Sequence, residues 1–314
     1  LSKAVNKPVK IAWTRQEEFQ FDLFRPAMLI ELTAGLDGSG NLAAWQYDLY
    51  STAYFPEGAK QPTRASAEAA ASVLDFYAVP NARTTFYQSV APLPPHFWRA
   101  NGSPVNGLAR EAAIDMLAET AGTDPVSFRT TLLQNNPRLL AVMNAAVQKA
   151  NWKPGVGSTG RGFGLGLSWT DGTYVAEVAQ VAVDKASGKV SVKHVDTAID
   201  CGLVINPEAV RCQVEGSVVM HGVSSTLKEQ IMFSGGRVTN TAFAQYNLLT
   251  MSETPTVDTV FVEDKKQPME GIGEPAVAAT TPAIANAIYD AVGVRLWDLP
   301  FTPDKVLAAI STKT

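Results

Sequence analysis

The pattern of apolar positions divides the chain into segments with two different periods. Apolar residues that alternate with polar ones, in two runs joined by a short glycine-containing turn, predict β-hairpins. The predicted hairpins pair residues 28–36 with 42–51 and 174–184 with 190–199, and a shorter one turns at 234–236. Residues 9–13 and 256–263 have the composition of single strands, and residues 55–72, rich in Ala, Pro and Gly, are predicted to be mainly loop.

Other segments carry apolar residues every three or four positions, which is typical of helices. Two of them start at Ser103-Pro104 and Asn206-Pro207, where a capping side chain precedes a proline. The predicted helices cover 103–121, 124–134, 137–150, 206–218 and 281–292. Because hairpins outnumber crossovers, we expect an α+β fold with mixed sheets. A Pro- and Gly-rich stretch at 151–160 predicts two lobes, 1–152 and 153–314.

The composition is that of an ordinary folded protein. Of the 314 residues, 46% are hydrophobic and 18% are charged, which is enough for a sizeable core. The net charge of −4 and the lack of a long basic run argue against nucleic acid as a partner. The apolar stretches are too short and too interrupted to span a bilayer.

The cysteines and histidines form no metal-binding pattern. Cys201 and Cys212 fit neither a disulfide framework nor a zinc or iron–sulfur spacing, so we expect two buried or half-buried thiols. The three histidines, His96, His194 and His221, are scattered. Any metal is therefore expected to be held mainly by a group other than protein side chains.

A carboxylate in a tight loop is the first candidate for chemistry. In the segment Gly271-Ile272-Gly273-Glu274-Pro275, the glycines allow unusual dihedral angles and Pro275 restricts Glu274 to an extended backbone. A general base needs such a fixed position. An ordinary surface turn with a solvated glutamate is the alternative.

Two further segments carry polar groups near a helix. Gln213 shares a helix face with Gly216, and its amide can both donate to and accept from a heterocyclic ligand; close helix packing at Gly216 is the alternative. Phe97-Trp98-Arg99 precedes a helix N-terminus, which favours anions, unless it is a packed aromatic corner. The run 160–166 lacks the ending of a phosphate loop and fits a glycine-rich edge strand or bend better.

Taken together and in this order, these segments resemble the molybdenum-binding large subunit of the xanthine dehydrogenase / aldehyde oxidase superfamily. The most similar branch is that of the isoquinoline 1-oxidoreductase beta subunits, and the resemblance covers nearly the whole chain. The motifs that carry it are residues 7–15, Phe24-Arg25-Pro26, Phe97-Trp98-Arg99, Asp200-Cys201-Gly202 with Asn206-Pro207, Gln213-Val214-Glu215-Gly216, and 271–275.

The resemblance implies a molybdopterin cytosine dinucleotide that carries molybdenum through its dithiolene sulfurs. Glu274 matches the family's glutamate, which takes the proton from a molybdenum-bound hydroxyl that attacks an electron-poor carbon of an aldehyde or an aromatic N-heterocycle. The inserted oxygen comes from water. The resemblance also implies cofactor contacts for Gln213, Arg99, Gly273 and Trp98, and a place for Phe97 in the substrate pocket unless it belongs to the core.

The chain also departs from the family. The family's Gly-Gly-Gly-Phe-Gly loop and the Met-Gly-Gln-Gly-type cofactor segment of this branch are absent, and Arg99 is followed by Ala100 instead of the glycine of xanthine dehydrogenases. The amino terminus has no initiator Met, so we expect this chain to be the continuation of an upstream segment of polypeptide. The expected partners are the amino-terminal half of the molybdenum subunit, a small subunit that carries [2Fe-2S] clusters, and a cytochrome or flavin electron acceptor.

A non-catalytic structural subunit of an oxidoreductase complex is the alternative function, because the two cofactor loops are absent. Metal analysis would separate the two readings, since a scaffold would contain neither molybdenum nor pterin. The sequence leaves bacterial periplasm and cytoplasm both open as the compartment.

Overall fold

The computed structural model describes all residues except 53–69, 71–72, 75, 91–92, 156–158 and 314. The loop predicted at 55–72 therefore lies almost entirely outside the described residues. Within the described part of the chain, every helix is too short or too polar to cross a membrane.

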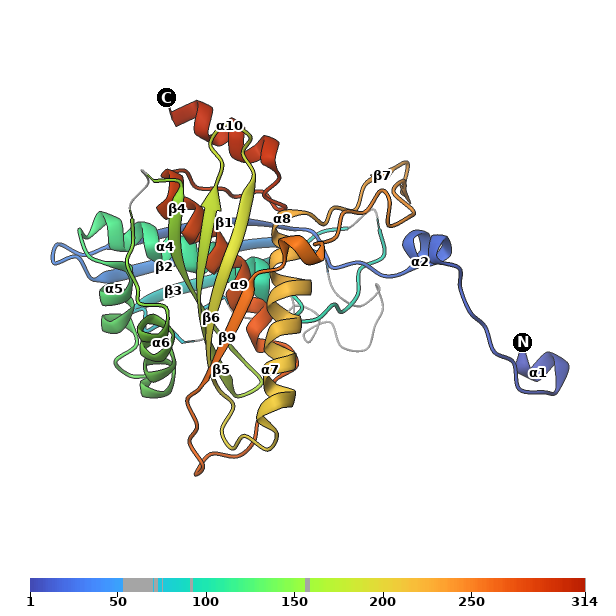
Figure 1. The fold of residues 1–314 in the computed structure, drawn as a ribbon, viewed down its shortest axis with the longest axis horizontal. Coiled ribbons are helices and arrows are strands. Elements are labelled where there is room, and N and C mark those ends of the chain that lie inside the picture. The colour runs from blue at the N-terminus through green and yellow to red at the C-terminus, as the bar shows by residue number, and fades with distance from the viewer. Residues whose placement is uncertain (53–69, 71–72, 75, 91–92, 156–158, 314) are drawn as a thin grey trace.

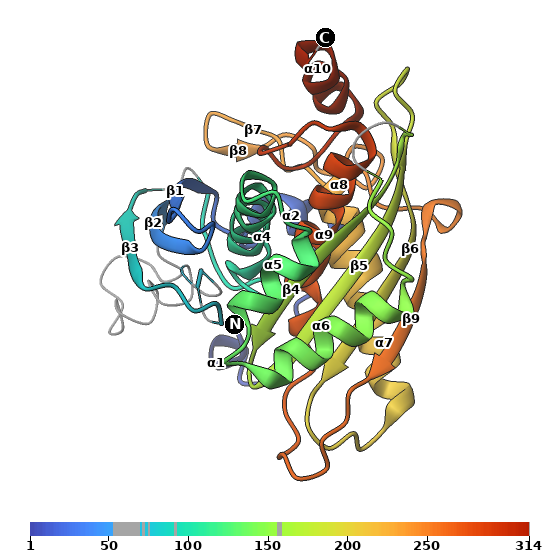
Figure 2. The same cartoon turned by 90° about the vertical axis from the view of Figure 1, so that its left-hand side faces the viewer.

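Two mixed sheets form the framework, and helices α4 and α9 lie between them (Figures 1 and 2). In the first sheet β2 pairs antiparallel with β1 and parallel with β3, and in the second β9 joins the antiparallel set β4-β5-β6 in parallel. The α+β prediction is confirmed. The strands are β1 (Met28–Leu36), β2 (Leu42–Ser51), β3 (Asn81–Gln88), β4 (Arg161–Thr170), β5 (Thr173–Val183), β6 (Val190–Asp200) and β9 (Thr256–Phe261), with a small hairpin β7 (Phe233–Ser234) and β8 (Arg237–Val238).

Helices cover both faces of the four-stranded sheet. On one face Val175 of β5 packs in a cluster with Ile284 of α9, and on the other Leu165 of β4 packs with Val142 of α6. The helices are α1 (Ser2–Val5), α2 (Arg15–Phe21), α4 (Ser103–Thr120), α5 (Pro125–Leu132), α6 (Pro137–Lys149), α7 (Pro207–Gly216), α8 (Ser224–Leu227), α9 (Pro275–Val292) and α10 (Pro303–Lys313), with a π-helical turn η1 (Ser217–Val223) and a 3-10 turn η2 (Met251–Glu253).

The glycine-rich run is edge strand β4, as the preferred interpretation of residues 160–166 predicted. Every second residue of this strand faces α9 directly. A Cβ added at Gly162, Gly164 or Gly166 would lie 2.2, 2.1 and 2.1 Å from the carbonyl oxygens of Ala287, Ala283 and Ala279, respectively. Only glycine therefore allows the helix to lie directly on the strand.

Helix α9 begins at Pro275, so the predicted start at Thr281-Pro282 is wrong. Pro282 lies inside the helix, where it has no N–H to donate to the carbonyl of Ala278. That carbonyl oxygen faces Gly107 of α4, at 2.9 Å from where a Cβ would stand. Burial against α4 and β4 thus keeps the helix intact across a residue that ends most helices. Helix α10 was not predicted.

The strand predicted at residues 9–13 is also wrong. These residues are exposed, and no described strand pairs with them. They belong to an amino-terminal arm that projects from the body of the fold (Figure 1). The arm contacts the body through Phe19, whose ring lies 5.3 Å from that of Phe243 and 5.4 Å from that of Tyr246.

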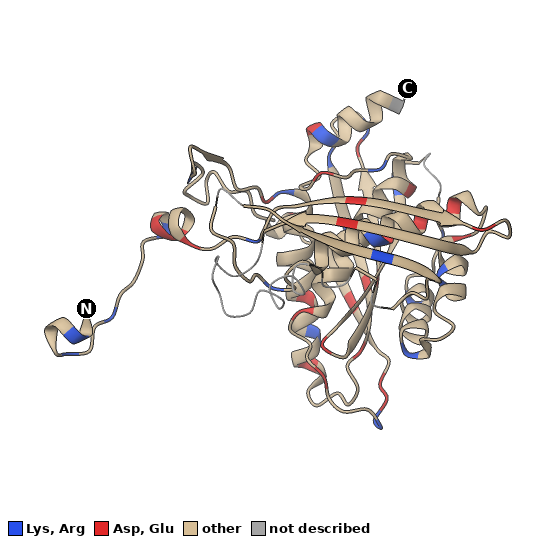
Figure 3. Cartoon of the chain, turned by 180° about the vertical axis from the view of Figure 1, so that it is seen from behind, with Lys and Arg blue, Asp and Glu red and all other residues tan. Residues whose placement is uncertain are grey.

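The division into lobes 1–152 and 153–314 stays a prediction. One hydrophobic cluster includes residues from both sides of this boundary, among them Ile114 of α4 and Leu165 of β4. Charged residues of α4 are paired inside the fold: Glu111 bonds Arg110 at 2.7 Å and Arg129 of α5 at 2.9 Å. Elsewhere acidic and basic residues are interspersed over the elements visible in Figure 3.

Buried Glu177 in β5 gives a testable pH dependence of stability. Burial raises the pKa of this carboxyl to about 8, while a hydrogen bond from Thr197 Oγ1 to Oε1, 3.3 Å long, acts in the opposite direction. The folded protein thus keeps a proton that the unfolded chain releases near its ordinary pKa of 4.5, so stability is lost as the pH rises from there to about 8. We expect the isosteric change Glu177→Gln to raise the thermal unfolding midpoint relative to wild type more at pH 8 than at pH 5. Equal shifts in calorimetry at the two pH values would contradict this.

Candidate functional site

The side chain of Arg99 connects segments that are far apart in the sequence. Its Nε donates to the carbonyl oxygen of Gly273, in the loop before α9. Its Nη2 donates to Gln213 Oε1 at 2.8 Å and to Ser217 Oγ at 2.7 Å, and its Nη1 lies 3.4 Å from Nδ1 of His221. The guanidinium therefore holds helix α7, the turn η1 and the loop before α9 in one place.

Glu274 lies at this junction with its carboxylate free of a capping role. It occupies the N-cap position of α9 but makes no side-chain cap hydrogen bond. Burial lowers the pKa of Arg99, and the charge of Glu274 opposes that effect. A half-buried carboxylate, a guanidinium and the amide of Gln213 thus share one site.

The backbone after Arg99 is strained. Ala100 and Asn101 have φ angles of 66° and 42°, in the left-handed region that favours glycine. Arg25 Nη2 donates to the carbonyl oxygen of Arg99 at 2.6 Å, which helps to hold the turn. A glycine in place of Ala100 would relieve part of this strain.

The segment Asp200-Cys201-Gly202 supports the loop that leads to Glu274. Gly202 has a φ of 69°, and a Cβ there would lie 1.9 Å from the carbonyl oxygen of Pro268. The carbonyl oxygen of Cys201 accepts a hydrogen bond from the backbone N–H of Glu270 at 3.0 Å. Two contacts within three residues therefore fix the path of this loop.

Asp200 is itself held from two directions. Its carboxylate accepts two hydrogen bonds from Arg138 of α6, at 2.8 and 2.9 Å, and one from the N–H of Gly202 at 2.9 Å. The charge-assisted pair links α6 to the end of β6, next to Cys201 and Gly202, which contact the loop that leads to Glu274.

The hairpin between β4 and β5 and the end of β4 hold the other side of the loop. Thr173 Oγ1 donates to the carbonyl oxygen of Gly271 at 2.7 Å, and Ser168 Oγ donates to that of Pro275 at 2.6 Å. Neither Gly271 nor Gly273 has a positive φ, so neither uses the dihedral freedom that glycine allows. The backbone of Glu274 has φ −117° and ψ −35°, so the extended conformation predicted from Pro275 is wrong: Glu274 is already helical where α9 begins.

Comparison with known proteins identifies the family. Two family models, each described as a molybdopterin cofactor-binding domain, match residues 1–133 and 106–255. A subunit of the nicotinate dehydrogenase of Pseudomonas putida is 33% identical over 99% of this chain, which covers 28% of that protein. The chain belongs to the xanthine dehydrogenase family of molybdenum-binding subunits.

A further curated relative agrees with this assignment, and a solved structure shares the fold. The beta subunit of isoquinoline 1-oxidoreductase from Brevundimonas diminuta is 29% identical over 96% of this chain and is covered to 39%. The chain thus spans less than half the length of both curated relatives. The crystal structure of quinoline 2-oxidoreductase from Pseudomonas putida 86 shares the fold, with a TM-score of 0.83 at 14% identity, over 99% of this chain and 65% of that one.

The candidate site is open beside two of its glycines. A Cβ added at Gly216 or Gly273 would meet no described atom within 4 Å, so packing within this part of the chain explains neither glycine. The close helix packing considered for Gly216 is therefore not what the structure shows. Open space beside Gln213 and Glu274 leaves both side chains accessible to a group from outside the chain.

The two aromatic residues of the segment 97–99 have different ring partners. Trp98 is 47% exposed, and its ring centroid lies 6.1 Å from that of His221, one of the residues next to the Arg99 guanidinium. Phe97 is half-buried and packs edge-on against His96 with centroids 5.1 Å apart. Trp98 thus joins the other predicted site residues, whereas the ring contact of Phe97 is with a neighbour in its own segment.

Sequence reasoning missed the roles of Ser217 and His221, and it gave Arg25 and Arg138 none. Ser217 and His221 follow Gln213 at intervals of four residues, which places all three on one face of a helix. That spacing was a usable signal. The contacts of Arg25 and Arg138 join residues that lie 74 and 62 positions away in the chain, and no local pattern predicts them.

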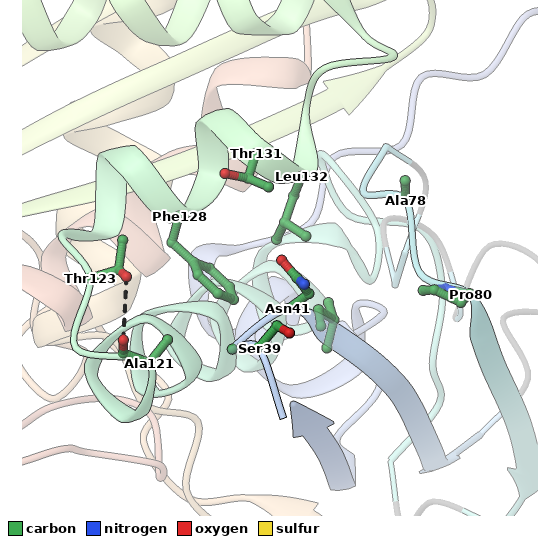
Figure 4. Close-up of a pocket in the computed structure, with 11 residues that line it drawn as sticks. Ser39, Asn41, Ala78, Pro80, Ala121, Thr123, Phe128, Thr131 and Leu132 are labelled. Atoms are coloured by element: carbon green, nitrogen blue, oxygen red, sulfur yellow. Dashed lines mark hydrogen bonds between the residues drawn. The ribbon is translucent and has the colours of Figure 1, made fainter. Parts of the chain in front are cut away.

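A separate pocket of about 310 Å³ lies between the turn after β1 and helix α5. In Figure 4, Phe128 and Leu132 of α5 face the same space as Ser39 and Asn41 of that turn. None of the residues that contact Arg99 lines this pocket. It is therefore distinct from the candidate site.

Two expectations about cysteine and histidine need correction. Cys201 is buried, but Cys212 is exposed on α7, so only one thiol is buried as predicted. The histidines do not come together, but one of them lies in a group that its sequence spacing did not indicate: ligand atoms of His194, Asp196 and Asp258 lie within 4.8 Å of one another. Asp258 is already paired with Lys149 at 2.7 Å, so the group reads as an ion-pair cluster on the sheet.

Proposed function

We propose that this chain supplies the general base and part of the cofactor-binding surface of a molybdenum hydroxylase. The enzyme would oxidise an aldehyde or hydroxylate an aromatic N-heterocycle with oxygen derived from water. The observation that carries the proposal is the convergence of Glu274, Gln213 and Arg99, from three separate segments, on one open site in a chain of this family. The names of the relatives, which act on nicotinate and isoquinoline, favour the N-heterocycle reading.

In this proposal each residue has a distinct role. Glu274, in a loop held by hydrogen bonds from Thr173 to Gly271 and from Glu270 to Cys201, would accept a proton at its carboxylate from the group that attacks the substrate. Gln213, Trp98, Gly273 and Arg99 would hold the pterin, and Phe97 would line the substrate pocket. When bound, the molybdenum cofactor activates the water-derived oxygen and accepts the two electrons of the oxidation.

The proposal also includes partner chains. The remaining part of the molybdenum subunit would complete the cofactor site, with a molybdopterin cytosine dinucleotide as the cofactor. A small subunit with [2Fe-2S] clusters would take the electrons to a cytochrome or a flavin. The chain itself spans 28% and 39% of the two curated relatives named above.

The proposal is tested on the complex that co-purifies with this chain. We expect stoichiometric molybdenum and a cytosine-containing pterin by elemental and nucleotide analysis. Turnover of an N-heterocycle or an aldehyde in H₂¹⁸O should place the label in the product. A complex without molybdenum or pterin would instead support the structural-subunit alternative, and unlabelled product would exclude a water-dependent hydroxylase.

A further inference from the structure

The π-helical turn η1 contacts Arg99 on one side and helix α9 on the other. Its first residue, Ser217, is fully buried and places Oγ 2.7 Å from Arg99 Nη2. One turn later Gly222 packs on α9, where a Cβ would stand 2.5 Å from Thr280 Cγ2. Single π-helical turns inside longer helices are rare and are frequently found at functional sites. Here the turn contacts Arg99, and the charge of the proposed base, Glu274, acts on that guanidinium.

We propose that Ser217 and His221 are positioning residues that hold the Arg99 guanidinium against the Gly273 carbonyl and the Gln213 side chain. The inference rests on the proposed function for its effect on turnover, and on geometry for the contacts themselves. Ser217 Oγ accepts from Arg99 and also donates to the carbonyl of Gln213 at 2.7 Å, so it relays between the two.

His221 contributes as a neutral acceptor. Its Nδ1 lies 3.4 Å from Arg99 Nη1, and only an unprotonated nitrogen can accept from a guanidinium. Burial and, next, the charge of Arg99 lower the pKa of His221, with a smaller contribution from Arg25, while a backbone hydrogen bond with Gly216 opposes them. These two arginines are the charged groups that act on the ring.

A protonated His221 would repel the cation that it holds in place. Because the lowered pKa keeps the folded form neutral, stability from this site is present above the ordinary pKa of 6.5 and is lost as the pH falls below it. The arrangement of Arg99 should therefore loosen in acid.

The first experiment compares Ser217→Ala with Ser224→Ala in the assembled enzyme. Ser224 is also buried and also bonded, to the N–H of Leu249 at 3.1 Å, but it does not contact Arg99. We expect Ser217→Ala to lower kcat per bound molybdenum about tenfold, the size typical of one lost hydrogen bond to a charged group, with little change in KM. Ser224→Ala should stay within about twofold of wild type. Equal kcat values for the two variants would overturn the role of Ser217.

The second experiment replaces His221. Asn places an oxygen near the position of Nδ1 and cannot be protonated, whereas Leu offers no acceptor. We expect His221→Leu to lower kcat about tenfold at pH 7.5 and His221→Asn to restore most of it. On the acid side, kcat of His221→Asn should fall less steeply than that of wild type. An Asn variant as impaired as the Leu variant, or with the wild-type acid limb, would overturn the role of His221.

A third measurement is independent of turnover. The thermal unfolding midpoint of wild type should drop more between pH 7.5 and pH 5.5 than that of His221→Asn, because only wild type takes up a proton on His221 when it unfolds. Identical drops would overturn the neutral-histidine arrangement even in an active enzyme. A complex that lacks molybdenum would refute the proposed function and leave this comparison decisive for His221.

Discussion

Glu274→Gln in the assembled enzyme should lower kcat by about 10²–10⁴-fold, the range that a positioned general base contributes. The substitution keeps the size and hydrogen-bonding capacity of the side chain but removes its ability to accept a proton. It should leave the fold intact, because the carboxylate makes no cap hydrogen bond with α9. Steady-state kinetics with molybdenum content measured on the same sample gives the result per active site.

The matched control is Glu270→Gln, the same change four residues earlier in the same loop. The loop contact of Glu270 is made by its backbone N–H to Cys201, which the substitution leaves unchanged. We expect wild-type kcat and full molybdenum content for this variant. Near-normal turnover of Glu274→Gln would refute the assignment of the base, and loss of molybdenum from it would show a cofactor-binding role instead.

Gly202→Ala should be the most disruptive single-methyl change near the site. A left-handed φ of 69° costs a non-glycine residue roughly 1–2 kcal/mol, and the added Cβ would stand 1.9 Å from a backbone oxygen of Pro268. Forcing an extra methyl into such a contact adds about 1–3 kcal/mol. Together these give a loss of about 2–5 kcal/mol in the free energy of unfolding. Because the loop must move, kcat should fall as well.

Gly236→Ala separates the two contributions. Gly236 has a similar φ of 75°, but no described atom lies within 4 Å of its Cβ position. Its loss of stability should be limited to the left-handed strain, about 1–2 kcal/mol, with unchanged kcat. Denaturant titration of the two variants side by side would reveal the cost of the contact with Pro268. If both lose the same amount, that contact does not constrain the loop.

The local pattern of apolar and polar residues was sufficient to predict most of the helices and strands. The hairpin of β1 and β2 has the predicted bounds, because alternation and the turn Asp37–Gly40 depend only on neighbouring residues. The start of α9 was missed, because the burial that tolerates Pro282 comes from α4, more than a hundred residues earlier. The strand predicted at 9–13 was wrong for the related reason that a strand requires a partner.

The site shows the same limit. Glu274, Gln213 and Arg99 were selected from separate motifs. In the structure the Arg99 guanidinium bonds Gln213 and the carbonyl of Gly273, and the charge of Glu274 acts on it. The contacts that hold these residues in place could not be predicted from the local sequence. The pairing of Arg138 with Asp200 and of Gly202 with Pro268 depends on how distant segments fold together. Their catalytic and binding roles remain predictions until the variants above are measured.

The direct contact between α9 and the glycines of β4 has a mechanical consequence. Where side chains separate two elements, rotamer changes allow them to slide, but a helix whose carbonyls lie on a strand's Cα atoms has no such freedom. Helix α9 and strand β4 should therefore move as one rigid unit, with Glu274 at the N-terminal end of the helix. Slow hydrogen exchange should extend along the whole strand-facing side of α9. Thermal motion in the outer loops would then leave the distance between Glu274 and the sheet nearly constant, which suits the proposed general base.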